Sequence, residues 1–274
     1  MRFLCFLLCA ALLLSLCACA QPPVLVPATD AENVPAAPTA EPTTETAQPA
    51  RSEPEAVVSE DIATAVLSEY SKEVYVRVSY PVLLSSPTAS ASIENFVEEL
   101  VAQYRPEATD LALELTPPEH APYWPDSDLA LELTGRITFC SEELVSVVFE
   151  GLYNAKTAVH PTNLLISRNF DPQTGERIRF ADRYVIDSAL YEAFVASAEA
   201  TITEQAGGTW PKGWGTFAEV FSCDEETFIA RLTAEETYHT FFTQTAVYLS
   251  LPTSHSACDH QEFPLPYDTL TPIQ

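Results

Sequence analysis

From residue 59 onward, apolar residues recur with two different periods, and each period predicts one kind of element. Residues 73–80 alternate strictly between apolar and polar side chains, as a half-buried strand does. Between 93 and 104, apolar residues recur three and four positions apart, which predicts a helix that Ser92 can cap. Further strand patterns occupy 129–140, 145–153, 164–170, 177–180, 238–242, 247–251 and 263–267.

Two more helices and a tight turn complete the pattern. Asp187 or Ser188 can begin a long helix that ends at Gly207-Gly208, and Ser222-Cys-Asp-Glu225 resembles a capping box for a shorter helix. Asp171-Pro-Gln-Thr-Gly175 has the composition of a turn. Blocks of strands and helices joined by short links predict an α+β fold, with antiparallel sheets packed with two to three helices.

The N-terminus has a different pattern. Arg2 is followed by an apolar run, 3–16, and then by small residues around a cysteine. This is the arrangement of a secretory signal, and the run is shorter than the about 20 apolar residues that a membrane span requires. We therefore expect the mature protein outside the cytoplasm.

The end of that signal, Leu16-Cys17-Ala18-Cys19, resembles a bacterial lipobox. The resemblance implies a lipoprotein signal peptide at 1–18 and a lipid on Cys19, which would anchor the protein to the bacterial cell membrane. The alternative is ordinary secretion, with cleavage after Ala18 or Ala20 and no lipid. Residues 19–58 are rich in Pro, Thr, Ala and Glu, a composition that predicts a disordered tether.

Charge narrows the choice of partners. The chain has 13 basic and 39 acidic residues, which gives a formal net charge of −26 at pH 7. Nucleic acid requires a positive protein surface, so we expect no nucleic-acid partner. A cationic partner is favoured by long-range attraction, although solubility alone would also explain such a charge.

The folded region contains Cys140, Cys223 and Cys258, an odd number that allows one disulfide. Cys223 and Cys258 lie in loop-like surroundings and form the candidate pair. No phosphate-binding glycine loop, nucleophile elbow or Cys-x-x-Cys motif is present. His255, Asp259 and His260 are the densest group of metal-ligand types, but we favour a polar loop between two terminal strands, where such residues are common without binding a metal. We expect no catalytic residue, metal or cofactor.

Three segments carry a family resemblance. They are 149–163, with His160 before a proline, the Asn-Phe-Asp-x-x-Thr-Gly run at 169–175, and 178–182. Together they resemble the extracytoplasmic domain of lysozyme-sensing anti-sigma factors of the RsiV type and the domains that precede the catalytic module in PdaC-type peptidoglycan deacetylases. The resemblance implies a PdaC-like α+β subdomain at 59–160 and an RsiV-like one at 161–274.

The chain departs from that family pattern at 156–159, where Lys-Thr-Ala-Val stands in place of Gly-Gly-Ala. It also lacks a sigma-binding segment and a deacetylase module. His160, Asn163, Asp171 and Asp182 are candidate ligand or turn residues; aspartates in such turns commonly bond to nearby backbone.

These observations predict a surface-tethered, non-enzymatic lipoprotein that binds an envelope component. By resemblance, the partner would be a cationic wall-lytic protein such as lysozyme, or peptidoglycan. One alternative is an enzyme or enzyme accessory that acts on envelope polysaccharide through His160 and nearby carboxylates. A structural envelope protein is the third.

Overall fold

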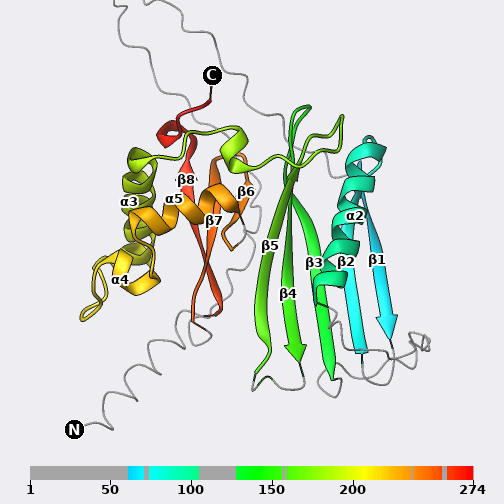
Figure 1. The fold of residues 1–274 in the computed structure, drawn as a ribbon, viewed down its shortest axis with the longest axis horizontal. Helices are drawn as coiled ribbons and strands as arrows, with labels where there is room; N and C mark the ends of the chain where they lie inside the picture. Colours follow the sequence, from blue (N-terminus) through cyan, green and yellow to red (C-terminus); the bar gives the residue numbers. More distant parts are fainter. Residues whose placement is uncertain are drawn as a thin grey trace, which may run out of the picture. The chain divides into compact units, whose positions relative to one another are not determined.

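The computed structural model describes residues 61–70, 74–104, 128–155, 158, 160–235, 237–254 and 258–273. The predicted signal peptide 1–18, the lipidation site Cys19 and the predicted tether 19–58 lie outside the described residues, as does His255. Within them the chain has an α+β fold with two sheets, as the sequence predicts (Figure 1).

The first sheet has five strands in the order β1-β2-β3-β4-β5. All neighbouring pairs are antiparallel except β2 and β3, which are parallel because a helix connects them. The expected boundary between residues 160 and 161 falls between β4 and β5, so this sheet continues to Phe170. Its strands are β1 (Ile62–Tyr70), β2 (Val74–Leu83), β3 (Leu129–Cys140), β4 (Val145–Ala155) and β5 (Thr162–Phe170).

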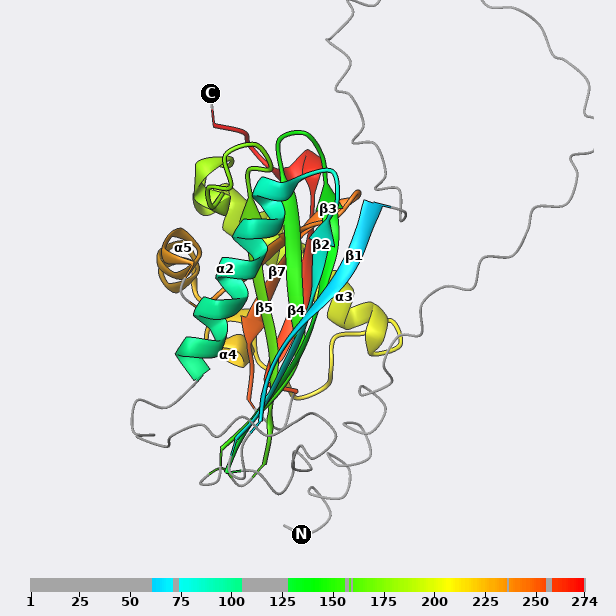
Figure 2. The same cartoon turned by 90° about the vertical axis from the view of Figure 1, so that its right-hand side faces the viewer.

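Helix α2 (Pro87–Tyr104) covers one face of the first sheet (Figure 2). Its buried stripe, which includes Phe96 and Leu100, packs against alternate residues of the strands. The helix begins at Pro87 and not at Ser92, because proline suits the first helical position and Ser86 Oγ accepts the Ala89 N–H at 3.3 Å. The Ser92 hydroxyl instead donates to the Gly175 carbonyl at 2.9 Å.

The second sheet has three antiparallel strands, β6 (His239–Phe242), β7 (Ala246–Pro252) and β8 (His260–Pro266). Helices α3 (Ser188–Gln205), α4 (Phe217–Phe221) and α5 (Glu225–Ala234) pack on it around a phenylalanine-rich core. Asp187 caps α3 as expected, whereas Asp224 and not Ser222 caps α5, because Ser222 ends α4 in a left-handed conformation.

The segment predicted as a strand at 177–180 forms only an isolated bridge between Arg177 and Phe170. A short 3-10 helix, η4 (Phe180–Asp182), follows it. Phe180 is completely buried in the second core, and its N–H donates to the carboxylate of Glu235. From Phe180 onward the chain therefore packs in the second core and not on the first sheet.

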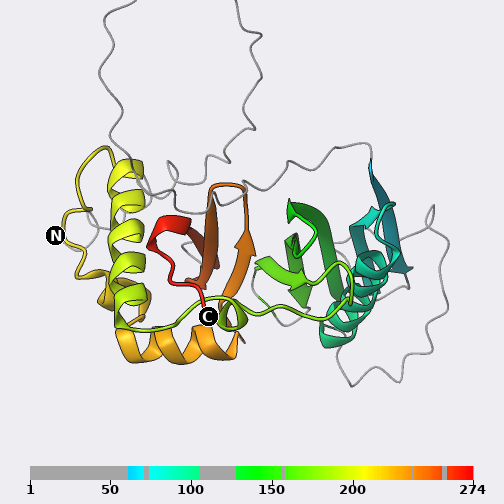
Figure 3. The same cartoon turned by 90° about the horizontal axis from the view of Figure 1, so that it is seen from above.

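Strands β5 and β6 lie next to each other where the two sheets meet (Figure 3). They are joined by side chains that bond to the β6 backbone. Ser167 Oγ donates to the Thr240 carbonyl at 2.8 Å, and Asn169 Nδ2 donates to the same oxygen at 3.0 Å. Strand β4 makes a similar contact with β6, since Ser146 Oγ accepts the Phe242 N–H at 2.9 Å. Among the described residues, the outer edge of β5 therefore has no backbone partner strand at this point, and side chains make the contact to β6.

Candidate functional site

The four candidate residues from the sequence lie in separate places. His160 is exposed just before β5, and Asn163 is near the beginning of that strand. The backbone N–H and side-chain amide of Asn163 both donate to Asp259 Oδ2, at 2.7 and 3.2 Å. Asp171 follows the other end of β5, so the structure does not bring Asn163 and Asp171 into one site.

Asp171 and Asp182 shape turns. Asp171 Oδ1 accepts the backbone N–H groups of Gln173 and Thr174 at 2.7 and 3.0 Å, and these bonds hold the pKa of the carboxyl below its usual value. Asp182 accepts the backbone N–H and the guanidinium of Arg179, and the side-chain bond is the main reason that the pKa of Asp182 is lowered. Their hydrogen bonds are those of turn residues.

The cysteines and histidines are also accounted for by local contacts. No disulfide joins Cys223 and Cys258, because Cys223 is buried in the second core whereas Cys258 is exposed. The Tyr238 hydroxyl donates to Cys223 Sγ at 3.2 Å, and burial raises the pKa of that thiol. His260 Nδ1 lies 2.7 Å from Glu262 Oε1. The described ranges contain no group of three or more metal-ligand side chains.

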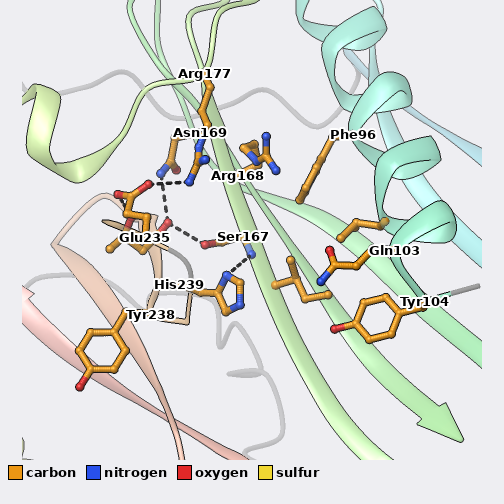
Figure 4. Close-up of a pocket in the computed structure, with 13 residues that line it drawn as sticks. Phe96, Gln103, Tyr104, Ser167, Arg168, Asn169, Arg177, Glu235, Tyr238 and His239 are labelled. Carbon is orange, nitrogen blue, oxygen red and sulfur yellow. Dashed lines mark hydrogen bonds and ion pairs between the residues drawn. The ribbon is translucent and has the colours of Figure 1, made fainter. Parts of the chain in front are cut away.

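A hollow of about 200 Å3 lies along the outer edge of β5, between the C-terminal half of α2 and strand β6. Three consecutive residues of β5, Ser167, Arg168 and Asn169, line the hollow (Figure 4). Gln103 and Tyr104 of α2 line one side and His239 of β6 lines the other (Figure 4). The edge without a partner strand is thus the floor of the hollow.

Arg168 occupies a position of β5 that faces α2. Its guanidinium carbon lies 4.0 Å from the centre of the Phe96 ring, and one of its nitrogens lies 3.6 Å from Glu99 Oε2. Burial, followed by the nearby Arg177, lowers the pKa of Arg168, but an arginine remains charged at neutral pH. The hollow therefore has a permanent positive charge that is stacked on an aromatic ring.

Glu235 provides the buried negative charge beside it. Its side chain is 5% exposed, and Oε2 lies 2.9 Å from a guanidinium nitrogen of Arg177. The other oxygen, Oε1, accepts the Phe180 N–H and the Thr240 hydroxyl. Both carboxylate oxygens are thereby occupied, so Glu235 neutralises Arg177 and anchors the wall of the hollow.

His239 is held in one tautomer. The Ser167 N–H donates to His239 Nδ1 at 3.4 Å, so that nitrogen accepts and the proton is on Nε2. Burial lowers the pKa of His239 to about 4, with contributions from His260, Arg168 and Arg177. At neutral pH the ring is uncharged and has a single N–H to donate.

Asn169 leaves one polar atom without a partner. Because the Thr240 carbonyl can only accept, it fixes the Asn169 amide with Nδ2 toward it. Oδ1 is buried and has no hydrogen-bond partner among the described residues, and Asn169 as a whole is 3% exposed. An unsatisfied buried acceptor costs about 1–3 kcal/mol, so this atom is a local weak point in the contact between β5 and β6.

Sequence reasoning missed this hollow. One signal was present: Arg168 stands between Ile166 and Phe170, at a strand position where the alternation calls for an apolar side chain. His239 and Asn169 have no such signal, because only the meeting of β5 and β6 places them together.

Comparisons with known proteins give likenesses in structure alone. No family model and no curated protein matches the chain. A solved DUF3298 family protein from Pseudomonas aeruginosa PAO1 is similar in fold, with a TM-score of 0.51 and 16% identity, over 78% of this chain and 98% of that one. A member of the same family from Bacteroides fragilis NCTC 9343 aligns with a TM-score of 0.44 and 11% identity, over 77% of this chain and 93% of that one.

The chain thus has the fold of a DUF3298 family protein, a domain whose function is unknown. None of the helices among the described residues is both long and apolar enough to cross a membrane.

Proposed function

We propose that the protein is a lipid-tethered, non-enzymatic lipoprotein of the cell envelope, and that its acidic domain captures a cationic wall-lytic protein such as lysozyme. The observation that carries the proposal is that the described arginines are already paired within the protein. Each described arginine has a carboxylate or ring partner: Arg77 with Glu132, Arg136 with Glu150, Arg168 with Glu99, Arg177 with Glu235, Arg179 with Asp182, Arg183 with Glu143 and Arg231 over Tyr238.

Because those cations are already engaged, the large surplus of carboxylates faces solvent with little internal compensation. Glu94 and Glu98 are exposed one turn apart on α2, an arrangement of like charges that is mildly destabilising in a helix. In the described part of the chain neither forms an ion pair with a basic side chain. A surface of this kind attracts cationic proteins and accelerates their association.

Two further observations support the proposal. The fold is that of a DUF3298 family protein, which is consistent with the resemblance to RsiV-type and PdaC-type extracytoplasmic domains. The lipobox-like Cys19 and the Pro-rich segment after it would hold such a domain at the outer surface of the membrane, where wall-lytic proteins arrive.

A pull-down of the full chain against hen lysozyme and against purified peptidoglycan, at low and at high salt, tests the proposal. We expect retention of lysozyme at low salt and release at high salt, since exposed charges are screened by salt. Retention of peptidoglycan alone would replace the protein partner with the polysaccharide one. Turnover of wall fragments that is lost in His160→Ala would instead identify an enzyme.

A further inference from the structure

Strand β1 ends the first sheet on the side away from β5, and its outer edge has no partner strand among the described residues. Natural proteins protect such edges with lysine, proline, a bulge or a very short strand. Residues 62–70 contain neither lysine nor proline, and all nine pair with β2 without a shift in register. We propose that this edge pairs with β1 of a second copy of the chain, so that two copies share one continuous sheet.

The other described sheet edges differ from β1. The outer edge of β5 meets β6, where His239 Nδ1 accepts the Ser167 N–H at 3.4 Å. In the second sheet, the edge strand β8 contains Pro264, and Ser197 Oγ of α3 donates to the Pro264 carbonyl at 2.6 Å. Among the described strands, β1 is therefore the one whose edge has neither a packed neighbour nor a proline.

The direction of the β1 backbone groups follows from one hydrogen bond at its beginning. The N–H of Leu84, directly after β2, donates to the Asp61 carbonyl at 2.9 Å, so the polar backbone groups of Asp61 point toward β2. These groups alternate in direction along an antiparallel strand, so those of residues 62, 64, 66, 68 and 70 point to the open edge. Pro81, which lies opposite Thr64 and has no N–H, agrees with this assignment.

Antiparallel pairing of two β1 strands about Val66 satisfies these outward groups. Val66 would lie opposite Val66 of the second copy, and Thr64 opposite Ser68 of the second copy, so each outward N–H and C=O meets a partner across a twofold axis. All three residues are exposed, Val66 by 51%. Contacts between valines and between hydroxyl side chains both stabilise cross-strand pairs. The strand is thus complementary to itself.

The charges of β1 also permit a second copy. Glu69 is the only charged residue of the strand, and pairing about Val66 places it opposite Ala63 of the second copy and not opposite another carboxylate. A peptide that adds to a sheet edge is selected by pockets for its alternate side chains. The exposed side chains here are small, and the hollow lies at the opposite edge of the sheet. These observations favour a second copy over an unrelated peptide.

The first test measures the mass of the full chain by sedimentation equilibrium over a range of protein concentrations, at low and at high salt. We expect a monomer–dimer equilibrium that shifts toward the dimer as salt is added. Salt screens the repulsion between two chains of net charge −26 but leaves the backbone hydrogen bonds in place. A mass of one chain under all conditions overturns the proposal.

The second test locates the contact by amide hydrogen exchange, followed residue by residue with NMR. The Ala65 and Leu67 amides point toward β2 and should exchange slowly at every protein concentration. The Thr64, Val66 and Ser68 amides should exchange fast in dilute protein and about tenfold more slowly in concentrated protein. Association that leaves these three amides unprotected would place the interface elsewhere and contradict the proposal.

The third test uses variants matched for charge. Val66→Lys places two ammonium groups opposite each other in the dimer and should raise its dissociation constant about tenfold. Thr134→Lys is the control, because Thr134 is an exposed residue of the interior strand β3 and gains the same charge. Val66→Pro removes one outward N–H, a change that an edge strand tolerates, and should weaken the dimer too. Equal dissociation constants for Val66→Lys and Thr134→Lys contradict the contact.

This inference does not depend on lysozyme capture, and the two respond to salt in opposite directions. Salt should strengthen the pairing of two acidic copies and weaken the binding of a cationic protein. Val66→Lys and Thr134→Lys should bind lysozyme equally and differ only in dimerisation. Dimerisation without lysozyme binding would overturn the capture alone, and lysozyme binding by a strictly monomeric chain would overturn the pairing alone.

Discussion

Arg177 and Glu235 form an ion pair of 2.9 Å that connects the end of the β5 turn to the end of α5. Glu235 takes a left-handed conformation, with φ at 47°, and its carboxylate also accepts the Phe180 N–H and the Thr240 hydroxyl. One buried carboxylate therefore fixes η4, α5 and β6 together. It also forms part of the wall of the hollow beside β5.

Replacing this carboxylate should be costly. Glu235→Ala removes the ion pair and two further hydrogen bonds, so we expect a loss of about 3 kcal/mol in the free energy of unfolding, measured by urea denaturation. Glu150→Ala removes an exposed partner of Arg136 and should cost less than about 1 kcal/mol. Similar losses in the two variants would show that Glu235 is no more than a surface charge.

The turn after β5 should tolerate only glycine at its last position. Gly175 has φ at +75°, and a Cβ there would lie 2.4 Å from Ser92 Oγ on α2. Gly213 also has a positive φ, +90°, but a Cβ there would meet nothing within 4 Å. Gly175→Ala should therefore lower the melting temperature further than Gly213→Ala, which pays only the backbone cost of about 1–2 kcal/mol. Equal shifts would mean that the Ser92 contact adds nothing.

His239 should make the protein less stable as the pH is lowered. Its pKa is lowered to about 4 in the folded state, below the ordinary value of 6.5, so the unfolded chain binds the proton first. The stabilisation is complete above about pH 6.5 and is lost progressively as the pH falls to about 4, by up to about 3 kcal/mol. Denaturation across this window should show a steeper decline in the unaltered chain than in His239→Gln. Parallel curves would contradict the assignment.

The position of the acidic contact can be located by paired substitutions. Glu94→Gln with Glu98→Gln removes two charges from α2, and Glu192→Gln with Glu204→Gln removes two from the exposed side of α3. If α2 contributes the contact, the first pair should weaken lysozyme binding more than the second, measured by isothermal titration. Equal weakening would indicate that only the net charge matters.

The sequence predicts most of the second core and the strands β2 to β5, because their apolar residues alternate or recur with clear periods. It does not predict β1, an edge strand in which Val66 is half exposed. It also places the beginning of α2 at Ser92, because Pro87 precedes the apolar stripe by several residues. Local patterns carry no information on such edges, which packing decides.

The site was less predictable than the fold. Asp171, Asp182 and Gly175 occupy the turns that their residue types indicate, so the sequence was informative on local structure. The pairing of Cys223 with Cys258 was wrong, since burial of one and exposure of the other depend on the whole fold. The hollow depends on β5 and β6, which are far apart in the sequence, and no local pattern records that contact.

Capture of a cationic wall-lytic protein is tested most directly by the association rate of the full chain with lysozyme at increasing ionic strength. A rate that is high at low salt and falls steeply as salt is added, while a lysozyme with acetylated lysines associates slowly throughout, is the predicted result. A rate that does not change with salt, or equal rates for native and acetylated lysozyme, would contradict capture by the acidic domain.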